Sequence, residues 1–171
     1  MSMLVVGMGD SKATNKREDV LTTYALGSCI AVMAYDAVAG VGGLLHLMLP
    51  DSSLDVKKAA ARPCMFADSG LRELIASVRL LGATRNHTTI WLVGGAQVIT
   101  SGDVFSIGKR NYQAVRRLLM SEGLTVRGEE VGGTVSRTVR LDVATGNVWI
   151  KGGNGISSHN AHEDTPWRLM S

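Results

Sequence analysis

The sequence predicts a mixed α+β fold, in which central mixed or antiparallel β-sheets form layers flanked by two main helices. Several short apolar runs of strand length are separated by turn residues, and two longer stretches show apolar residues at helical spacing. Hydrophobic residues make up 45% of the 171 residues and charged residues only 19%, so a single domain can bury a substantial aliphatic core. The order of strands and helices is too irregular for a repeated βαβ array.

The first third of the chain is predicted to be almost entirely β-structure. Residues 3–8 and 20–24 are β-prone, whereas residues 9–19 are polar and are expected to form a loop. Residues 29–35 and 41–49 are two apolar runs joined by a short turn, which is the pattern of a β-hairpin. Because both runs are apolar on both faces, the hairpin is expected to be central and covered on each side.

Two helices and a further set of strands complete the predicted domain. The first helix runs from Pro63 to Gly82 with an apolar stripe, and the second runs from about Lys109 to Glu122 and ends at Gly123. The remaining strands are expected at residues 89–93, 97–100, 124–129, 135–143 and 147–151.

The composition changes near the C-terminal end. Residues 1–153 are predicted to form the folded domain, and residues 154–171 a flexible C-terminal tail rich in polar residues. This tail contains His159, His162, Glu163 and Asp164, which are residue types that bind metals. No helix is predicted there to bring them together, so we expect a tail and no metal site.

Charge and hydropathy exclude several classes of protein. The net charge is only +3, and the basic residues form small groups typical of solvated helix faces, so we expect no nucleic-acid binding. The longest apolar run, residues 41–49, is too short to span a bilayer, and the N-terminus lacks the features of a signal peptide. The sequence therefore predicts a soluble, cytoplasmic protein without membrane insertion, in which Cys29 and Cys64 are free thiols.

The hairpin carries the residues that suggest chemistry. A turn centred near Val38 places Cys29 opposite His46 to within about one residue of register, with Cβ atoms roughly 5 Å apart. A thiol beside an imidazole can form a thiolate–imidazolium pair, in which the thiolate is a nucleophile and the imidazolium protonates a leaving group. The structural alternative is a buried cysteine beside a hydrogen-bonded core histidine. Cys64 lies on the apolar stripe of a helix, where core packing explains it better.

The residues around Cys29 extend this hypothesis. Gly27 and Ser28 allow a sharp turn before the cysteine, and backbone N–H groups in such a turn can bind an oxyanion. A third residue should orient the imidazole. The residues themselves leave Thr22, Thr23 and Ser28 as alternatives for this role.

A set of motifs resembles one known family. The strings LGSCIAVMAYD and VGGLLHLMLPDS, followed in order by FAD, GGA, IGKRN and GGTVSR, are similar to the chemoreceptor glutamine deamidase family, CheD, over residues 3–151. The resemblance implies a cysteine-hydrolase fold shared with deamidating toxins. It also implies a Cys29–His46–Thr23 triad, and so selects Thr23 among the three hydroxyl residues. One departure from the family pattern is Ala25, where a glycine is usual.

The resemblance also implies an activity and partners. It suggests an enzyme that hydrolyses specific glutamine side chains of methyl-accepting chemotaxis receptors to glutamate and ammonia through a thioester, with possible demethylation of glutamyl methyl esters by the same residues. No cofactor is expected, and the implied partners are the receptors' cytoplasmic parts and a CheC-type phosphatase. The alternative is a regulatory binding module that contacts the phosphatase or the receptors with little catalysis.

Overall fold

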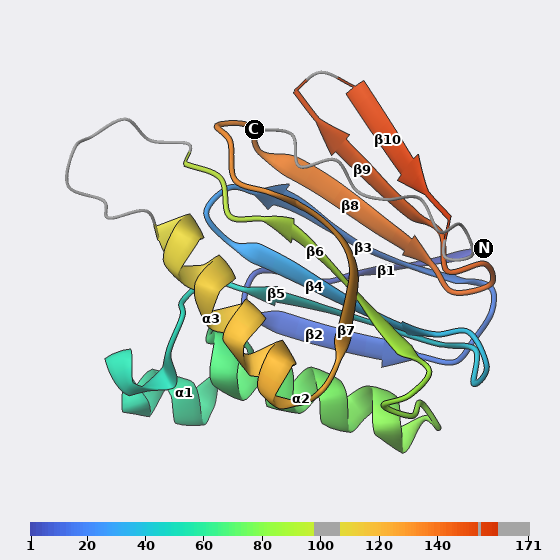
Figure 1. Ribbon diagram of the computed structural model, residues 1–171, viewed down its shortest axis with the longest axis horizontal. Coiled ribbons are helices and arrows are strands. Elements are labelled where there is room, and N and C mark those ends of the chain that lie inside the picture. Colours follow the sequence, from blue (N-terminus) through green and yellow to red (C-terminus); the bar gives the residue numbers. More distant parts are fainter. Residues whose placement is uncertain (98–106, 154, 161–171) are drawn as a thin grey trace.

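The computed structural model describes residues 1–97, 107–153 and 155–160, in which ten strands form two five-stranded sheets (Figure 1). Sheet A has the strand order β1-β3-β8-β9-β10, and sheet B the order β2-β5-β4-β6-β7. The strands of sheet A are β1 (Ser2–Val5), β3 (Asp19–Leu26), β8 (Arg137–Asp142), β9 (Val148–Gly152) and β10 (Gly155–His159). The strands of sheet B are β2 (Asp10–Thr14), β5 (Val41–Leu47), β4 (Ile30–Asp36), β6 (Thr88–Gly94) and β7 (Thr125–Val131).

Each sheet combines parallel and antiparallel pairs. In sheet A, β1 runs parallel to β3, and in sheet B, β6 runs parallel to β7, whereas the other neighbours are antiparallel. The predicted α+β class with mixed sheets is therefore confirmed.

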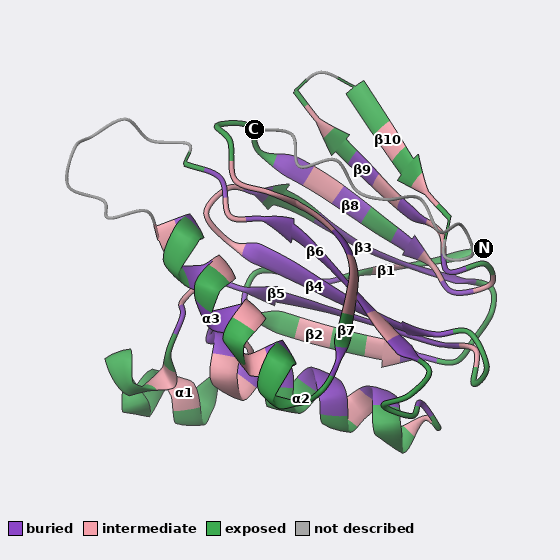
Figure 2. Ribbon diagram, in the orientation of Figure 1, coloured by how far each residue is buried: buried purple, intermediate pink, exposed green. Residues whose placement is uncertain are grey.

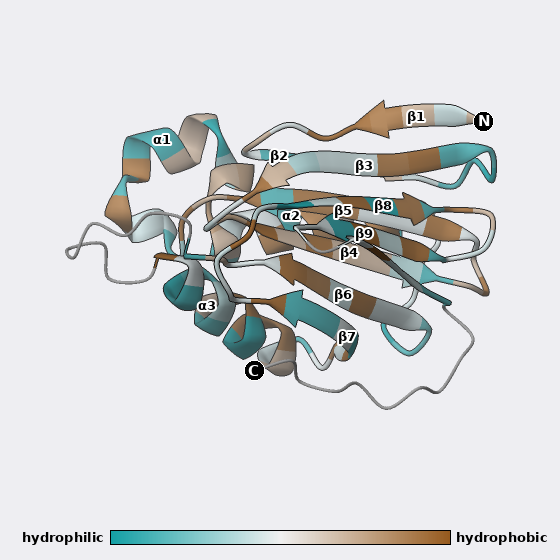
Figure 3. Ribbon diagram, turned by 90° about the horizontal axis from the view of Figure 1, so that it is seen from above, coloured by the Kyte–Doolittle hydropathy of each residue, from teal (hydrophilic) through white to brown (hydrophobic). Residues whose placement is uncertain are grey.

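The helices are α1 (Val56–Ala61), α2 (Ala67–Leu80) and α3 (Ile107–Ser121), with short 3-10 turns at Ser52–Leu54 and Pro63–Met65. Of these, α2 and α3 cover one face of sheet B, whereas α1 packs against the 3-10 turns. One apolar cluster lies between sheet B and the helices α2 and α3, and a second lies between the two sheets. Figure 2 shows β4, β5 and β6 almost entirely buried, and Figure 3 shows hydrophobic segments along β3, β6 and β8. Every residue of β4 and β5 is buried, so the central position predicted for the hairpin is confirmed.

Close packing of α2 on the hairpin depends on a glycine. A Cβ at Gly43 in β5 would lie 2.6 Å from Val78 Cγ1 and 2.8 Å from Leu74 Cδ1, both on α2. The helix can approach the strand because this position has no side chain. No helix in the described ranges is both long and apolar enough to cross a bilayer.

Some elements differ from the prediction. Residues 10–14 form β2 instead of the expected loop, and residues 155–159 form β10, so regular structure continues beyond the boundary predicted at residue 153. Both are edge strands with polar sequences, and an edge strand needs few apolar residues because little of it is buried. The first predicted helix starts later, at Ala67, because the segment from Pro63 forms a 3-10 turn, and α1 was not predicted. Residues 98–100, predicted as part of a strand, and 161–171, in the predicted tail, lie outside the described residues.

Candidate active site

The candidate site lies where the chain passes from sheet A to sheet B. β3 ends at Leu26 and β4 begins at Ile30, so Gly27, Ser28 and Cys29 form the crossing between the sheets. A register shift between Thr23 and Leu26 marks a β-bulge just before this crossing. Ala25 lies in that bulge with φ of 56° and is the one non-glycine residue with positive φ in the described chain. This is the conformation that favours the glycine usual at this position in the family it resembles.

His46 projects from β5 in sheet B toward β3 in sheet A. Its side chain is buried, and its Nδ1 lies 2.7 Å from Thr23 Oγ1. The Thr23 hydroxyl also lies 2.6 Å from the carbonyl oxygen of Val6, to which it donates. Since a hydroxyl has one proton, which Thr23 gives to Val6 O, Thr23 Oγ1 must accept a hydrogen bond from Nδ1–H of His46. The imidazole is therefore held as the Nδ1–H tautomer, and the Nε2 lone pair is available as a base.

The structure distinguishes the three hydroxyl residues that the sequence left open. Thr22 Oγ1 donates to Val139 O on β8 at 2.9 Å, so it is engaged within sheet A. Ser28 lies in the crossing segment and lines the pocket described below. The contact to the imidazole is made by Thr23, the residue that the resemblance selects.

The relation between Cys29 and His46 differs from the predicted one. In the observed register, His46 pairs with Ala31 and Leu47 pairs with Ile30, so Cys29 lies beyond the ladder and is displaced from His46 by two residues. Cys29 packs against the apolar cluster between the sheets, the region into which His46 projects, so the two are diagonal and not directly opposed. Diagonal neighbours have Cα atoms about 7–8 Å apart, with Cβ atoms somewhat closer. Accordingly, Nε2 of His46 is buried without a hydrogen-bond partner among the described residues.

Burial favours the neutral forms of both groups. Desolvation raises the pKa of the Cys29 thiol, an effect partly offset by a hydrogen bond from its own backbone. Desolvation also lowers the pKa of His46 to about 4. The sequence suggested a resting thiolate–imidazolium pair, but burial disfavours it. Each charged form loses its hydration on burial, and the surrounding protein does not provide enough favourable interactions to compensate. A neutral imidazole diagonal to a neutral thiol can act as a general base toward a latent nucleophile.

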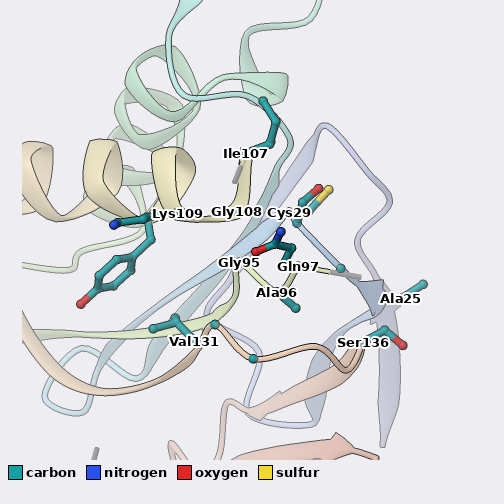
Figure 4. Close-up of a pocket in the computed structure, with 15 residues that line it drawn as sticks. Ala25, Cys29, Gly95, Ala96, Gln97, Ile107, Gly108, Lys109, Val131 and Ser136 are labelled. Atoms are coloured by element: carbon teal, nitrogen blue, oxygen red, sulfur yellow. The ribbon is translucent and has the colours of Figure 1, made fainter. Parts of the chain in front are cut away.

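A cavity of about 600 Å³ opens beside the thiol (Figure 4). Cys29, Ser28 and Ala25 line one side of it. The surrounding walls come from the turn after β6, the start of α3 and the segment between β7 and β8, and include Gln97, Ile107, Lys109, Tyr112, Val131 and Ser136. The half-buried cysteine is thus accessible from a cavity large enough for a side chain of another protein.

Several residues near this cavity were not predicted as part of a site. Lys109 and Tyr112 lie on α3, and Gln97 follows the GGA turn after β6. Asn111, also on α3, is fully buried, and its amide contacts the backbone of the crossing segment. The IGKRN string contained Lys109 and Asn111, but a sequence pattern does not say which loop a helix N-terminus will contact.

The other candidates lie elsewhere. Cys64 belongs to the 3-10 turn before α2 and packs against the cluster beneath the helices, as expected for a core cysteine. His159 lies on β10, where its ring stacks on Trp91 with centroids 5.1 Å apart. His162, Glu163 and Asp164 lie outside the described residues. Within the described ranges, no three potential ligands of the His, Cys, Asp or Glu type form a metal-binding cluster.

Comparisons with known proteins place the chain in a family. Residues 48–152 match the family model described as CheD chemotactic sensory transduction. A Solibacter usitatus protein named probable chemoreceptor glutamine deamidase CheD is 45% identical over 151 residues, which is 88% of this chain and 89% of that protein. The chain belongs to the CheD family. A Syntrophus aciditrophicus CheD with the same description is 43% identical over 91% of this chain and 97% of its own length.

A further relative and one solved structure are also similar to this chain. The Pyrococcus abyssi CheD, again named a probable chemoreceptor glutamine deamidase, is 39% identical over 84% of this chain and 87% of its own length. Among solved structures, a Neisseria meningitidis protein of the DUF152 family has a TM-score of 0.48 at 12% identity, covering 78% of this chain and 63% of that protein.

Proposed function

We propose that this protein is a chemoreceptor glutamine deamidase that uses Cys29 as nucleophile, His46 as general acid and base, and Thr23 as the residue that orients the imidazole. The observation that carries the proposal is the Thr23–His46 contact of 2.7 Å, which fixes the tautomer that leaves Nε2 without a proton and free to act as a base. Membership of the CheD family supplies the substrate class, the glutamine side chains of methyl-accepting chemotaxis receptors.

The first half of the reaction forms a thioester. The substrate carboxamide enters the cavity, and the Cys29 thiol gives its proton to Nε2 of His46 as Sγ attacks the carboxamide carbon. The developing oxyanion is stabilised by backbone N–H groups of the Gly27–Cys29 crossing. The tetrahedral intermediate collapses when Nε2–H protonates the amide nitrogen, which leaves as ammonia.

The second half hydrolyses the thioester. Nε2, again unprotonated, takes a proton from water, whose oxygen attacks the thioester carbon. The C–S bond breaks, the thiolate recovers the proton from the imidazolium, and the products are a glutamate side chain and free Cys29. The lowered pKa of His46 suits this cycle, because a neutral imidazole is regenerated at every turnover at neutral pH. None of these steps requires a cofactor, and the same steps would cleave a glutamyl methyl ester.

The partners and location follow from the substrate. We propose that the protein acts in the cytoplasm on the cytoplasmic parts of receptors. A CheC-type phosphatase is a further proposed partner. A regulatory binding module that uses the same surface with little catalysis is the alternative, and it predicts that removing the thiol leaves the biological effect intact.

The test measures ammonia release and glutamine-to-glutamate conversion by mass spectrometry on a purified receptor cytoplasmic fragment. We expect the wild type and Cys64→Ala to release ammonia at similar rates, and Cys29→Ala to fall by about 10⁴-fold or more, as is typical on loss of a nucleophile. Cys64→Ala is the matched control because it removes the other half-buried thiol. Equal rates for Cys29→Ala and the wild type would refute the proposed role of Cys29.

A further inference from the structure

The segment that carries the proposed nucleophile is held in place by hydrogen bonds to its own three consecutive carbonyl groups. Gly27 O accepts a hydrogen bond from Ala96 N at 2.8 Å, and Cys29 O accepts one from Gly95 N at 2.8 Å. Between them, Ser28 O accepts from Asn111 Nδ2 at 3.0 Å. The outer two bonds come from the backbone of the turn after β6, whereas the central bond comes from a side chain on α3.

Asn111 makes a second contact that links this segment to the strand of His46. The same Nδ2 lies 3.0 Å from Met48 O, and Met48 is the second residue after His46. Both contacts are carbonyl oxygens, so the NH2 group must face them and uses both of its protons. The β4–β5 ladder ends at the pair Ile30–Leu47, just before this point. The Asn111 amide therefore bridges the two strand ends where their own pairing stops.

Because Asn111 is buried, its NH2 group cannot exchange these two hydrogen bonds for bonds to water. The residue is fully buried on the face of α3 that packs toward the sheet. Only the NH2 group is paired, since Oδ1 is buried without a hydrogen-bond partner among the described residues. Losing both bonds of the NH2 group would leave buried donors unpaired, each at a cost of about 1–3 kcal/mol. Gly94, at the end of β6, also packs closely against this segment, since a Cβ there would clash with the carbonyl oxygen of Cys29. The crossing segment is thus clamped between α3 and the turn after β6.

We infer that Asn111 is a positioning residue for the deamidation reaction, which sets the separation and direction of Cys29 relative to His46. The inference rests on the proposed function. A trans peptide unit points its C=O and N–H in opposite directions, so binding Ser28 O to Asn111 turns the N–H of Cys29 away from α3. Ser28 and Cys29 line the cavity, so fixing this peptide unit also fixes how the Cys29 backbone and thiol meet a bound carboxamide.

Positioning predicts an effect on turnover that a purely structural role does not. A displacement of about 1 Å in a reacting group can cost about 100-fold in rate. We therefore expect Asn111→Asp, which has the same shape but cannot donate two hydrogen bonds, to lower kcat on the receptor fragment by about 10- to 100-fold. KM should change less than about twofold, since Asn111 does not line the cavity.

The matched control is Thr88→Val. Thr88 is buried at the other end of β6, and its Oγ1 donates to Thr84 O at 2.6 Å, so its loss also removes a side-chain bond to a backbone carbonyl. All variants are assayed well below their melting temperatures. If Asn111→Asp does not fold, Asn111→Ser, a smaller residue that retains one donor, takes its place. A folded Asn111 variant with wild-type kcat, or a loss no greater than that of Thr88→Val, would overturn the inference.

A second readout separates this inference from the proposed function. The rate of Cys29 alkylation by iodoacetamide is measured between pH 6 and 9 for the same variants, with Cys64 in the same sample as an internal reference. We expect the pH profile of Cys29 to change in the Asn111 variants and to stay unchanged in Thr88→Val. If the wild type releases no ammonia from the receptor fragment, the proposed function fails, and the alkylation profile still decides whether Asn111 positions the thiol. An unchanged profile would overturn the positioning role.

Discussion

The two thiols of this protein are alike in burial and different in surroundings. Both are half-buried, and desolvation raises the pKa of both, to about 11 for Cys64. Cys29 borders a cavity and lies diagonal to a histidine with a free Nε2, whereas Cys64 has the carboxylates of Glu73 and Asp10 nearby, which raise its pKa further. Burial raises the pKa of both thiols, so the acidity of the resting thiol does not single out the proposed nucleophile. What distinguishes Cys29 is a neighbouring base and access for a substrate.

The largest expected difference between the thiols is in alkylation. At neutral pH, iodoacetamide should modify Cys29 about 100-fold faster than Cys64, because His46 can accept the thiol proton during attack. His46→Asn retains a group that can donate to Thr23 and removes Nε2, so it should abolish most of this advantage. Peptide mapping by mass spectrometry measures both rates in one sample. Faster labelling of Cys64 in the folded wild type would contradict the assignment of Cys29.

Acid unfolding tests the environment of His46 directly. Its pKa falls from 6.5 to about 4 on folding, so between these values the unfolded chain binds a proton that the folded chain does not. This contribution to stability is complete above pH 6.5 and is lost as the pH falls toward 4, at a cost of up to about 3 kcal/mol.

The measurement is urea unfolding of the wild type and His46→Asn at pH 7.5 and 4.5. The wild type should lose up to about 3 kcal/mol more than the variant over this range, because asparagine does not titrate. His87→Asn is the control, because His87 is exposed and lies in the turn before β6, and this variant should show the same pH dependence as the wild type. The same pH dependence in the wild type and His46→Asn would show that His46 is not buried in its neutral form.

The smallest expected effect separates two adjacent threonines. Thr23→Val removes the acceptor for Nδ1–H and should lower kcat by about 5- to 150-fold, which corresponds to about 1–3 kcal/mol for the loss of one hydrogen bond to a buried group. Thr22→Val removes a bond of 2.9 Å to Val139 O, so it should cost similar stability with little change in kcat. Thr23→Ser should recover most of the activity. Equal losses of kcat in the two valine variants would argue against an orienting role for Thr23.

Much of the fold could be predicted because the strongest hydrophobic patterns of the sequence correspond to buried elements in the structure. The hairpin, with β4 and β5 buried throughout, and the apolar stripes of α2 and α3 are local patterns that tertiary contacts reinforce. The edge strands β2 and β10 were missed because polar residues on an exposed edge resemble a loop. These strands are stabilised by backbone hydrogen bonds to a neighbouring strand, and a local sequence pattern does not identify that neighbour.

The sequence by itself determined the candidate residues, since the spacing of Cys29 and His46 in one hairpin and the glycine before the cysteine are local features. The tertiary structure decided their relationship. The register of β4 and β5 places the pair diagonally, and packing of sheet A on sheet B brings Thr23 to the imidazole. The helix α3, more than 60 residues later in the chain than His46, brings Asn111 to the backbone around both. These contacts depend on how distant elements fill a shared core, and no periodicity within a single element encodes them.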